Sequence, residues 1–568
     1  MEATAHREVD YQKLSFPFRR AAEQDEDRQI VHPVVVVGAG PIGLATAIDL
    51  AQQGIRVVLL DNDNTLSTGS RAICFAKRTL EIFDRLGCGK RMLEKGVRWN
   101  VGKVFLQDEL IYTFDLLPES GHAYPAFINI QQYYVEGYLA DRALTMSNLE
   151  IRWNNQVEAI EQTADTVSMR VSTPDGEYTV RAQYVVAADG SRSTIRKAMG
   201  LDSRGRVFKD RFLIADVKMK ASFPTERWFW FDPPFHRNQS VLLHKQPDDV
   251  WRIDFQLGWD ADPVAEKEPE RVIPRVKALL GDDVEFELEW VSVYTFSCLR
   301  MDDFRHGRVL FAGDSAHGVS PFGARGANSG VQDGDNLAWK LKFVLDGTAP
   351  DALLDTYASE RQFAAEENIL NSTRATDFIT PKSAISRVFR DATLKLAKDC
   401  AFARRVVNSG RLSLPSVLSD SPLNTPDAPN DTFSGAMALG AVCTDAPIAI
   451  DGRVRWFLET VAESAFAVVV FAAPGESAAS YAQRLAGLRT DHVPVHGIVV
   501  MPSGEAVADP APAGITAIED IDGVLAQRFD ARAGSCYLLR PDQHLCARWR
   551  AFDPADVRAA VQRAICQS

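Results

Sequence analysis

The chain has 568 residues, 46% of them hydrophobic, which is enough for several cores, and we expect three lobes. Asp and Glu number 76 against 63 Lys and Arg, giving a formal charge of −13. This balance argues against a nucleic-acid partner and against an anionic membrane surface, and it favours small molecules or other proteins as partners.

The start of the chain and its cysteines bear on its compartment. The first residues show no apolar signal-peptide core, and no apolar run reaches the roughly 18 residues needed to cross a bilayer. The 8 cysteines are scattered, without CxxC or ligand-like spacing. We therefore expect a cytoplasmic protein with no membrane span and no metal site.

Regular structure is predicted to begin after a polar start. Residues 1–30 are polar and charged, which predicts an arm that lies on the surface or contacts a neighbouring subunit. A β-branched run at residues 34–37 leads into a glycine-rich turn at residues 38–43, then helical spacing over residues 44–54 and a second strand over residues 56–61. This order is typical of a unit that binds half of a dinucleotide.

Changes in residue pattern and composition divide the rest of the chain into further parts. Between residues 210 and 296, apolar and aromatic runs alternate with polar residues, which predicts a mostly antiparallel sheet inserted into the nucleotide-binding part. Residues 308–314 return the chain to that part. Residues 412–431 are rich in Pro, Ser and Asp and indicate a linker. The remainder, with strands and helices of its own, is predicted to be a further domain.

The first glycine-rich turn has the residues that a dinucleotide phosphate needs. At Gly38, Gly40 and Gly43 the missing side chains permit a tight turn, close approach to a pyrophosphate, and close packing of helix on strand. The helix starting at Pro41 would direct unpaired N–H groups and its positive end at the phosphates. Asp61, ending the second strand, is placed to accept hydrogen bonds from a ribose. The alternative is a tight turn without a ligand.

A second glycine signature indicates which dinucleotide is bound. Gly313 and Asp314 follow a predicted strand, where the carboxylate is placed to accept from ribitol hydroxyls; a simple turn carboxylate is the alternative. After Pro321 a helix begins whose first N–H groups would face the pyrimidine edge of a flavin, and its dipole would favour the reduced, negative ring by about 0.3 to 2 kcal/mol. Its first residues are Gly326, Ala327 and Asn328. Two such glycine signatures imply that the protein binds one large cofactor at both of its ends. We interpret this cofactor as FAD.

Three motifs together resemble the fingerprints of the single-component flavoprotein aromatic hydroxylases. They are the glycines of residues 38–43, the segment DGSRSTIR at 189–196 and GDSAH at 313–317, and they occur in the family's order and spacing over about residues 31–400. The overall pattern resembles the branch that hydroxylates phenols and hydroxyphenyl-alkanoates such as 3-(3-hydroxyphenyl)propionate.

The resemblance implies an α/β fold with a Rossmann-like FAD-binding domain, an inserted, mostly antiparallel β-sheet substrate domain and a C-terminal thioredoxin-like domain. The implied parts are an N-terminal arm (1–30), the FAD-binding domain in two stretches (31–209 and 301–411), the substrate-binding sheet (210–300), a linker (412–435) and the thioredoxin-like domain (436–568). That last domain lacks CxxC, so we expect packing or formation of a homodimer from it and no thiol redox chemistry.

The resemblance also implies roles for single residues. Asp189, Arg192 and Ser193 would stabilise the region where FAD and the nicotinamide nucleotide both pass. The others are Arg71, along the flavin and holding its mobile ring; Gln132, near the FAD phosphates, with adjacent Gln131 as the alternative; and Val157, near adenine. For the Asp189 motif the alternative is a strand, turn and helix in which Asp189 caps the helix and Arg196 pairs locally. For Arg71, Gln132 and Val157 it is an ordinary surface or core role.

The implied reaction is a monooxygenation. NADPH or NADH would reduce FAD and would bind transiently, because only one complete GxGxxG is present. Reduced flavin would capture O2 as a hydroperoxide whose distal oxygen attacks an electron-rich aromatic ring, without a metal. A phenol is the favoured substrate since ionising its hydroxyl raises the electron density of the ring, and a base or acceptor beside that hydroxyl would help.

The inserted sheet offers His244, Arg252, Asp254 and Tyr294 for that acceptor. His244 and Tyr294, with Arg71, are the predicted catalytic residues, and a solvated or packing role is the alternative for each. The aromatic residues among 228–235 either line the bottom of a substrate pocket or pack in a hydrophobic core. The core role is favoured.

Two other functions fit parts of the pattern. The run WFWFDP at residues 228–233 comes close to the tryptophan motif of flavin-dependent halogenases, but Asp232 stands where an apolar residue belongs. A non-catalytic flavin-fold binding protein is the second alternative. NAD(P)H oxidation that a phenol stimulates without halide would exclude the first, and a yellow protein with such activity would exclude the second.

Overall fold

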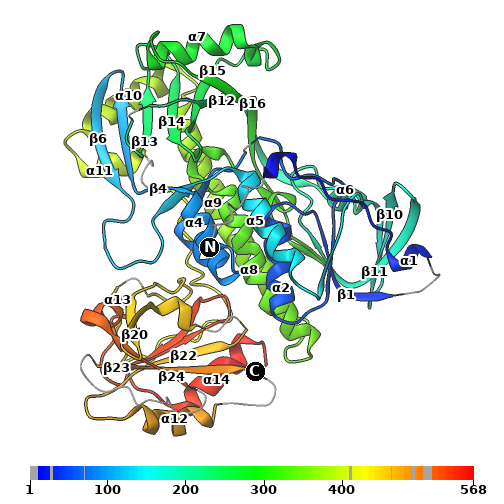
Figure 1. Cartoon of the computed structure of the whole chain (residues 1–568). Helices are drawn as coiled ribbons and strands as arrows, with labels where there is room; N and C mark the ends of the chain where they lie inside the picture. The colour runs from blue at the N-terminus through cyan, green and yellow to red at the C-terminus, as the bar shows by residue number, and fades with distance from the viewer. Residues whose placement is uncertain are drawn as a thin grey trace, which may run out of the picture.

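Four sheets organise the described part of the chain in the computed structural model. The structure describes residues 10–25, 30–69, 71–221, 223–407, 412–435, 437–461, 464–488, 493–502 and 515–567. Figure 1 shows the inserted sheet at the top, the nucleotide-binding sheet at the right and the C-terminal sheet at the bottom. Helices α8 (Gly326–Leu345) and α9 (Leu353–Ile379) run through the middle between them.

The nucleotide-binding sheet is centred on β1 (Val31–Val37), which lies between two parallel neighbours, β2 (Val57–Leu60) and β11 (Gly176–Ala187), and buries its last four valines, residues 34–37. α2 (Pro41–Gln52) follows β1 and packs on α5 (Gln132–Leu144) and on α8. The predicted succession of strand, turn, helix and strand is therefore present. The other strands of this sheet are β8 (Leu149–Arg152), β9 (Gln156–Gln162), β10 (Val167–Thr173), β17 (Arg305–His306) and β18 (Val309–Phe311).

The inserted sheet is mostly antiparallel, as predicted, but it is not confined to residues 210–300. Two strands from much earlier in the chain, β5 (Val101–Leu106) and β6 (Glu109–Asp115), extend it, and β5 runs parallel to β13 (Arg227–Phe231). The alternation of residues predicts a strand but not the sheet it joins, because pairing depends on contacts far apart in sequence. The other strands are β12 (Ser203–Lys218), β14 (Ser240–Lys245), β15 (Val250–Leu257), β16 (Glu287–Met301) and β19 (His317–Gly318).

The two faces of the inserted sheet have different partners because successive side chains of a strand point to opposite sides. On the outer face, Leu213, Ala215 and Ile253 pack in one core with α7 (Pro269–Leu280). The residues that alternate with them, such as Ile214 and Arg252, face a cavity instead. One face of the sheet thus packs in a core, and the other lines a cavity.

A small sheet and several helices connect these parts. The small sheet pairs β3 (Cys74–Ala76) and β4 (Val97–Trp99) with β7 (Phe127–Asn129). The connecting helices are α3 (Lys77–Arg85), α4 (Gly89–Lys95), α6 (Thr194–Ala198), α10 (Ala384–Ala397) and α11 (Ala401–Val407).

The described part of the predicted N-terminal arm packs on its own chain. Tyr11 lies edge-on to Tyr134 and Tyr138, and Phe16 stacks on Trp153 with ring centres 4.3 Å apart. The short helix α1 (Ala22–Asp25) follows. Residues 1–9 and 26–29 of the predicted arm lie outside the described residues.

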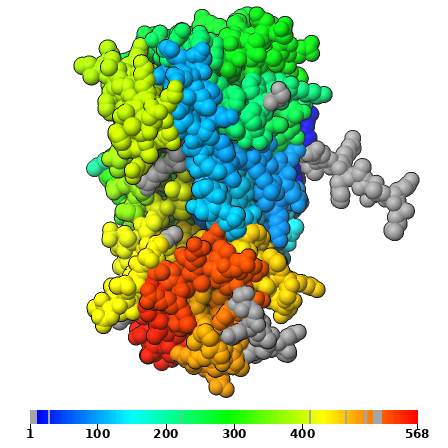
Figure 2. Space-filling view, turned by 90° about the vertical axis from the view of Figure 1, so that its left-hand side faces the viewer, coloured from blue at the N-terminus to red at the C-terminus, as the bar shows by residue number. Residues whose placement is uncertain are grey.

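The C-terminal residues form a lobe of their own, coloured orange to red in Figure 2. Its sheet combines parallel β22, β23 and β24 with an antiparallel final pair, β25 and β26. Its strands and helices are β20 (Pro447–Ile450), β21 (Arg453–Trp456), β22 (Phe466–Phe471), β23 (Val495–Met501), β24 (Ile515–Asp520), β25 (Cys536–Leu539), β26 (Leu545–Trp549), α12 (Ala478–Ala486), α13 (Val524–Phe529) and α14 (Pro554–Ala564). The predicted linker, residues 412–435, contains no helix or strand.

Across the described ranges, none of the helices combines the length and the apolar character that a membrane span requires.

Candidate active site

One cavity of about 640 Å³ lies between the nucleotide-binding sheet and the inner face of the inserted sheet. Residues far apart in the sequence meet on its walls. The predicted cofactor residues that line it are Gly38, Gly40, Pro41, Asp61, Arg71, Gln132, Val157, Asp189, Arg192, Asp314, Pro321, Gly326, Ala327 and Asn328. Both glycine signatures therefore face the same cavity.

The first glycine turn contains glycines of two kinds. A Cβ on Gly38 would lie 2.5 Å from the carbonyl oxygen of Ala188, and one on Gly43 would lie 1.8 Å from the carbonyl oxygen of Gly38. Backbone atoms therefore leave no room for a side chain at either position. Gly43 packs behind the cavity and does not line it. A Cβ on Gly40 would meet no protein atom within 4 Å, although the extended backbone there suits any residue. Packing does not explain Gly40, which leaves room in the cavity.

Two helices begin at the cavity wall. α2 starts at Pro41 and α8 starts at Gly326, and neither has a side-chain cap. Uncapped first turns leave N–H groups available and place the positive ends of two helix dipoles at the cavity, where they favour an anion or a developing negative charge.

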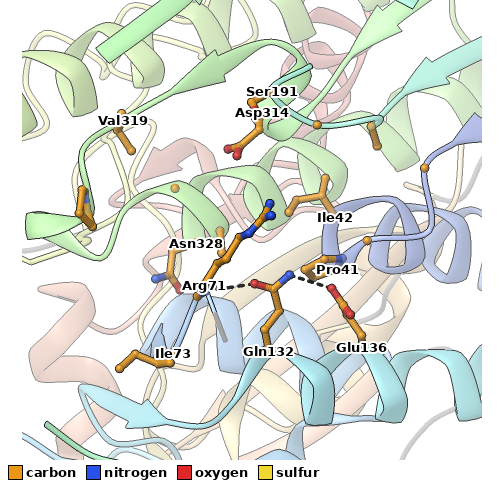
Figure 3. Close-up of a pocket in the computed structure, with 18 of the residues that line it drawn as sticks. Pro41, Ile42, Arg71, Ile73, Gln132, Glu136, Ser191, Asp314, Val319 and Asn328 are labelled. Carbon is orange, nitrogen blue, oxygen red and sulfur yellow. Dashed lines mark hydrogen bonds between the residues drawn. The ribbon is translucent and has the colours of Figure 1, made fainter. Parts of the chain in front are cut away.

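Asp314 and Arg71 extend into the same space (Figure 3). The Asp314 side chain keeps accessible surface on the cavity side, yet protein encloses it, and this burial raises the pKa of its carboxyl while His317 and Arg71 oppose the rise. A neighbouring cation and a hydrogen-bonding ligand would both favour the ionised form.

A buried network behind Asp314 fixes the turn that carries it. The N–H of Gly313 donates to Asp333 at 2.9 Å, and the φ of +62° at Gly313 is one that glycine adopts freely. His317 Nε2 lies 2.7 Å from the same carboxylate, and Arg361 Nε donates to it at 2.7 Å. Gly313 does not line the cavity, so its structural part is to shape the turn.

Gln132, and not Gln131, faces the cavity. Gln132 Oε1 accepts from the Ala72 N–H at 3.0 Å, and Nε2 donates to Glu136 at 2.8 Å (Figure 3). Gln131 is buried and donates to the carbonyl of Pro247 at 3.2 Å. Of the two glutamines that the sequence left open, Gln132 lies on the cavity wall and Gln131 does not.

Asp61 follows β2, and Val157 lies in β9 on the same cavity wall. The Asp61 carboxylate accepts from the N–H groups of Ala39 and of Asp63, the latter at 2.8 Å. Burial raises the pKa of Asp61, and these backbone donors oppose that rise. Backbone contacts thus orient a carboxylate that still borders the cavity.

The middle motif, directly after β11, places its residues differently. Asp189 Oδ2 accepts from the Ile195 N–H at 3.0 Å, whereas Asp189 Oδ1 is buried without a hydrogen-bond partner. Arg192 is exposed and lines the cavity. Ser193 is buried away from the cavity and caps α6 by accepting from the Arg196 N–H at 3.0 Å.

His244 and Tyr294 line the part of the cavity formed by the inserted sheet. Burial lowers the pKa of His244 well below 6.5, and the nearby cations Arg227 and Arg252 lower it further. Burial also raises the pKa of Tyr294; Asp314 adds to this rise and Arg71 opposes it. Both side chains are therefore neutral near pH 7. The apolar residues around them are Phe212, Ile214, Leu242, Trp290 and Phe322.

The tryptophan-rich run lies away from the cavity. Trp228, Trp230, Phe231 and Phe235 do not line it. Trp230 and Phe235 instead pack edge-on at 5.8 Å in the cores of the inserted sheet. The preference for a core role over a pocket floor is confirmed for these residues, and the halogenase-like motif has no access to the site.

The cavity suits a long anionic cofactor on three independent observations. Gly40 leaves space that no protein atom fills. Two uncapped helix starts offer N–H groups. Asp189 Oδ1 is a buried acceptor that lacks a partner. Buried polar atoms are nearly always hydrogen-bonded, so the last observation indicates a ligand with a donor.

Comparison with known proteins agrees with this geometry. Residues 32–372 match the FAD binding domain family and residues 446–564 match the HcaD C-terminal domain. The chain belongs to the FAD binding domain family. A relative at 30% identity, 6-methylpretetramide 4-monooxygenase of Streptomyces rimosus, aligns over 93% of both chains.

Two other relatives of this FAD-binding protein are hydroxylases by name. The 3-(3-hydroxy-phenyl)propionate/3-hydroxycinnamic acid hydroxylase of Mycobacterium sp. (strain KMS) is 28% identical over 90% of this chain and 87% of that protein. The probable NADH-specific resorcinol 4-hydroxylase of Rhodococcus jostii (strain RHA1) is 34% identical over 58% of this chain and 62% of that protein.

Solved structures share the fold. The flavin-dependent monooxygenase PieE, in complex with FAD and substrate, has a TM-score of 0.78 at 20% identity and covers 95% of this chain and 100% of its own. The OxyS anhydrotetracycline hydroxylase of Streptomyces rimosus has a TM-score of 0.69 at 25% identity, with 94% and 99% covered. The predictions of an FAD-dependent aromatic monooxygenase and of a resemblance to the phenol hydroxylase branch are confirmed, and the halogenase and binding-protein alternatives are not favoured.

Sequence reasoning did not identify two sets of residues at the site, one behind the cavity and one on its wall. Asp333 and Arg361 hold the Asp314 turn from α8 and α9 and belong to no motif. Arg227 is a buried cation on the cavity wall. Its position on the inner face follows from the pairing of β13 and β14, which a single sequence does not reveal. The alternation along β13 was the only available signal.

Proposed function

We propose that this flavoprotein hydroxylates a phenolic ring, using NADPH or NADH and O2. The observation that carries the proposal is that both glycine signatures and the inner face of the inserted sheet line one cavity of about 640 Å³. A cofactor that touches both signatures would present its reactive end to that face. When bound, FAD would supply the redox chemistry that couples NAD(P)H oxidation to oxygen activation.

Different residues would hold different parts of FAD. Gly40 and the start of α2 would bind the pyrophosphate, because open space, free N–H groups and a positive dipole end coincide there. Gln132 would approach the same phosphates. Asp61 would accept from the ribose hydroxyls beside an adenine near Val157, and Asp314 would accept from ribitol hydroxyls. The start of α8 would face the pyrimidine edge.

Arg71, Tyr294 and His244 would act where the substrate meets the ring. Arg71 would steady the ring by its charge, since its side chain crosses the cavity (Figure 3). Tyr294 and His244, both neutral near pH 7, would orient a hydroxyl by donating and accepting hydrogen bonds. The apolar wall of Phe212 and Phe322 would exclude water from the reacting atoms.

A phenol is the proposed substrate class. Two of the relatives carry phenols in their names, 3-(3-hydroxy-phenyl)propionate and resorcinol. The cavity offers the matching surroundings, an aromatic and aliphatic wall with a few converging polar groups.

The nicotinamide nucleotide would use no Rossmann unit of its own. Arg192, exposed at the cavity wall beside Asp189, would assist it by pairing with a phosphate. Measurement with both nucleotides decides between NADH and NADPH.

The finer architecture belongs to the same proposal. The C-terminal lobe would be a thioredoxin-like domain with a role in packing or in a homodimer, within the domain limits given from the sequence. All eight cysteines, including Cys443, Cys536 and Cys546 in this lobe, are free, which supports a reducing cytoplasm as the compartment.

The test is a panel of phenols incubated with the purified holoenzyme. Both NAD(P)H consumption and hydroxylated product are measured, because an effector can trigger oxidation without being hydroxylated. The proposal expects at least one phenol to give product in proportion to NAD(P)H consumed. NAD(P)H oxidation without product for every phenol, or a protein that neither retains nor takes up flavin, would refute it.

A further inference from the structure

Three polar side chains at the inserted-sheet end of the cavity have no partner in the protein. Arg227 Nη1, His244 Nδ1 and Asp254 Oδ1 are each buried without a hydrogen bond. Within the described residues, none of the three side chains makes an ion pair or a hydrogen bond with protein, and all three line the cavity. A buried polar group left unpaired lowers the stability of the fold, so three together indicate a ligand that supplies their hydrogen bonds.

Strand register shows that the three are neighbours. His244 pairs with Arg252 across β14 and β15, and Asp254 follows two residues later on the same face. Trp228 pairs with Leu243, so Arg227 stands beside His244 on the next strand. Arg227 and Asp254 each lie on a strand next to that of His244, and all three side chains line the same cavity.

Arg252 serves as the internal comparison. Its guanidinium donates to Asp216 at 2.8 Å through both Nε and Nη2, and Nη1 reaches the carbonyl of Arg71 at 3.3 Å. The protein itself therefore neutralises Arg252. Arg227, on the same wall, receives no such partner from the described residues, and burial lowers its pKa.

The charges of these side chains determine which chemical group of a ligand can bind beside them. With Arg252 paired to Asp216, what remains is one cation, Arg227, one carboxylate, Asp254, and a neutral His244. The net charge of this remainder is zero when Asp254 is ionised. A carboxylate ligand would leave the cluster with an uncompensated negative charge, whereas a phenol hydroxyl has a proton for Asp254 and an oxygen for Arg227.

We propose that Arg227, His244 and Asp254 anchor the hydroxyl of the phenolic substrate, with Asp254 as the acceptor of its proton. The inference rests on the proposed function and names residues for it. The phenolic O–H bond breaks and an O–H bond forms on the Asp254 carboxylate; the electron pair stays on the phenolic oxygen, which Arg227 holds as an anion and to which His244 donates. No electron is transferred in this step.

The surroundings of Asp254 suit that role. Burial raises its pKa from 3.8 to about 6, with Asp216 adding to the rise and Arg252 and Arg227 opposing it. A proton acceptor is most effective when its pKa lies near the working pH. The titratable and charged groups around it on the sheet and on β3 are Arg227, His244, Arg252, Asp216 and Cys74.

The test compares three probes of one size on the holoenzyme: 4-nitrophenol, 4-nitroanisole and 4-nitrobenzoate. Binding is followed by the change in flavin absorbance, and the ionisation of 4-nitrophenol by its own spectrum, in a buffer acidic enough to keep the free probe protonated. We expect 4-nitrophenol to bind as the anion and about tenfold or more tighter than both other probes, which corresponds to one hydrogen bond to a charged group. A preference for 4-nitrobenzoate, or no preference, overturns the inference.

Variants assign the preference to residues. Asp254→Asn and Arg227→Gln should each abolish the preference and the ionised spectrum while retaining FAD. Glu289→Gln, which removes an exposed carboxylate from β16, should keep both. With the best phenol of the panel, kcat/KM of the wild type should fall as the pH drops through about 6, and Asp254→Asn should lose this limb with about a hundredfold lower rate.

The two proposals fail in different ways. If no phenol gives product with the wild type, the proposed function fails. If phenols give product but both variants keep the 4-nitrophenol preference and the acidic limb of the profile, only the anchor assignment fails.

Discussion

Two buried groups of charges in this molecule are built on opposite principles. At the junction with the C-terminal lobe, Arg540 donates to Glu360 at 2.6 Å and Lys340 donates to the same carboxylate at 2.8 Å. Arg78 reaches Asp335 at 2.8 Å close by. In the cavity, by contrast, Arg227 Nη1 and Asp254 Oδ1 are buried without a hydrogen bond.

The difference separates a structural group from one arranged for a ligand. In the junction cluster, burial acts to raise the pKa of Glu360, but Arg540 and Lys340 hold it well below its usual range. In the cavity, burial raises the pKa of Asp254 and no contact reverses the effect. At the junction, removing one partner would leave a buried charge uncompensated; in the cavity, the unpaired groups already lower the stability of the fold until a ligand binds.

The largest effect should come from filling the cavity at its first glycine turn. Gly40→Val adds a side chain where no protein atom lies within 4 Å, so the fold should persist while flavin binding and all activity are lost. Flavin absorbance of the purified protein measures this. The matched control is Gly258→Val, at an exposed glycine whose Cβ also meets no protein atom but lies outside the cavity. It should stay yellow; a yellow Gly40→Val protein would contradict the placement of the cofactor.

Breaking the junction cluster should cost the most stability. Arg540→Met leaves Glu360 and Asp542 buried without their guanidinium, which should lower the free energy of unfolding by about 3–5 kcal/mol. Denaturant unfolding at fixed FAD concentration measures it. Arg455→Met, which removes an exposed pair with Glu459 at 3.9 Å, is the control and should change it by about 0–1 kcal/mol. Equal effects of the two variants would mean that the buried cluster contributes no more to stability than an exposed ion pair.

Neutralising the cavity carboxylate should change stability in the opposite direction. The pKa of Asp254 rises from 3.8 to about 6 on folding, so the destabilisation is absent below pH 3.8, grows up to about pH 6 and is complete above it. Asp254 keeps some accessible surface on the cavity side, which moderates the effect. Asp254→Asn should therefore be more stable than the wild type at pH 7.5 by about 1–3 kcal/mol, and equally stable at acidic pH. A less stable variant at pH 7.5 would show that Asp254 has a partner.

The smallest effect is expected at the exposed edge of the cavity. Arg192→Gln should raise KM for NAD(P)H about fivefold, the value of one exposed charge-assisted contact, and leave flavin content unchanged. Arg204→Gln, an exposed arginine paired with Asp302, serves as the control. An unchanged KM in Arg192→Gln would remove Arg192 from the nucleotide site.

These contrasts also show which features a single sequence predicts. The first glycine turn and the start of α8 are local patterns, in which spacing alone implies strand, turn and helix, and the cavity brings both together. The pairing of β5 with β13 and the alignment of Arg227 beside His244 depend on strand register, which is set by contacts distant in sequence. The Asp333 carboxylate was missed for a similar reason, because its partners come from three separate elements.

A crystal structure of the protein with FAD would show most directly whether one cofactor contacts both glycine signatures. We expect one FAD that spans the cavity, with its pyrophosphate at Gly40 and its ring between Asp314 and the start of α8, facing Tyr294 and His244. A flavin that reaches only one of the two signatures, or a different ligand spanning both, would contradict it.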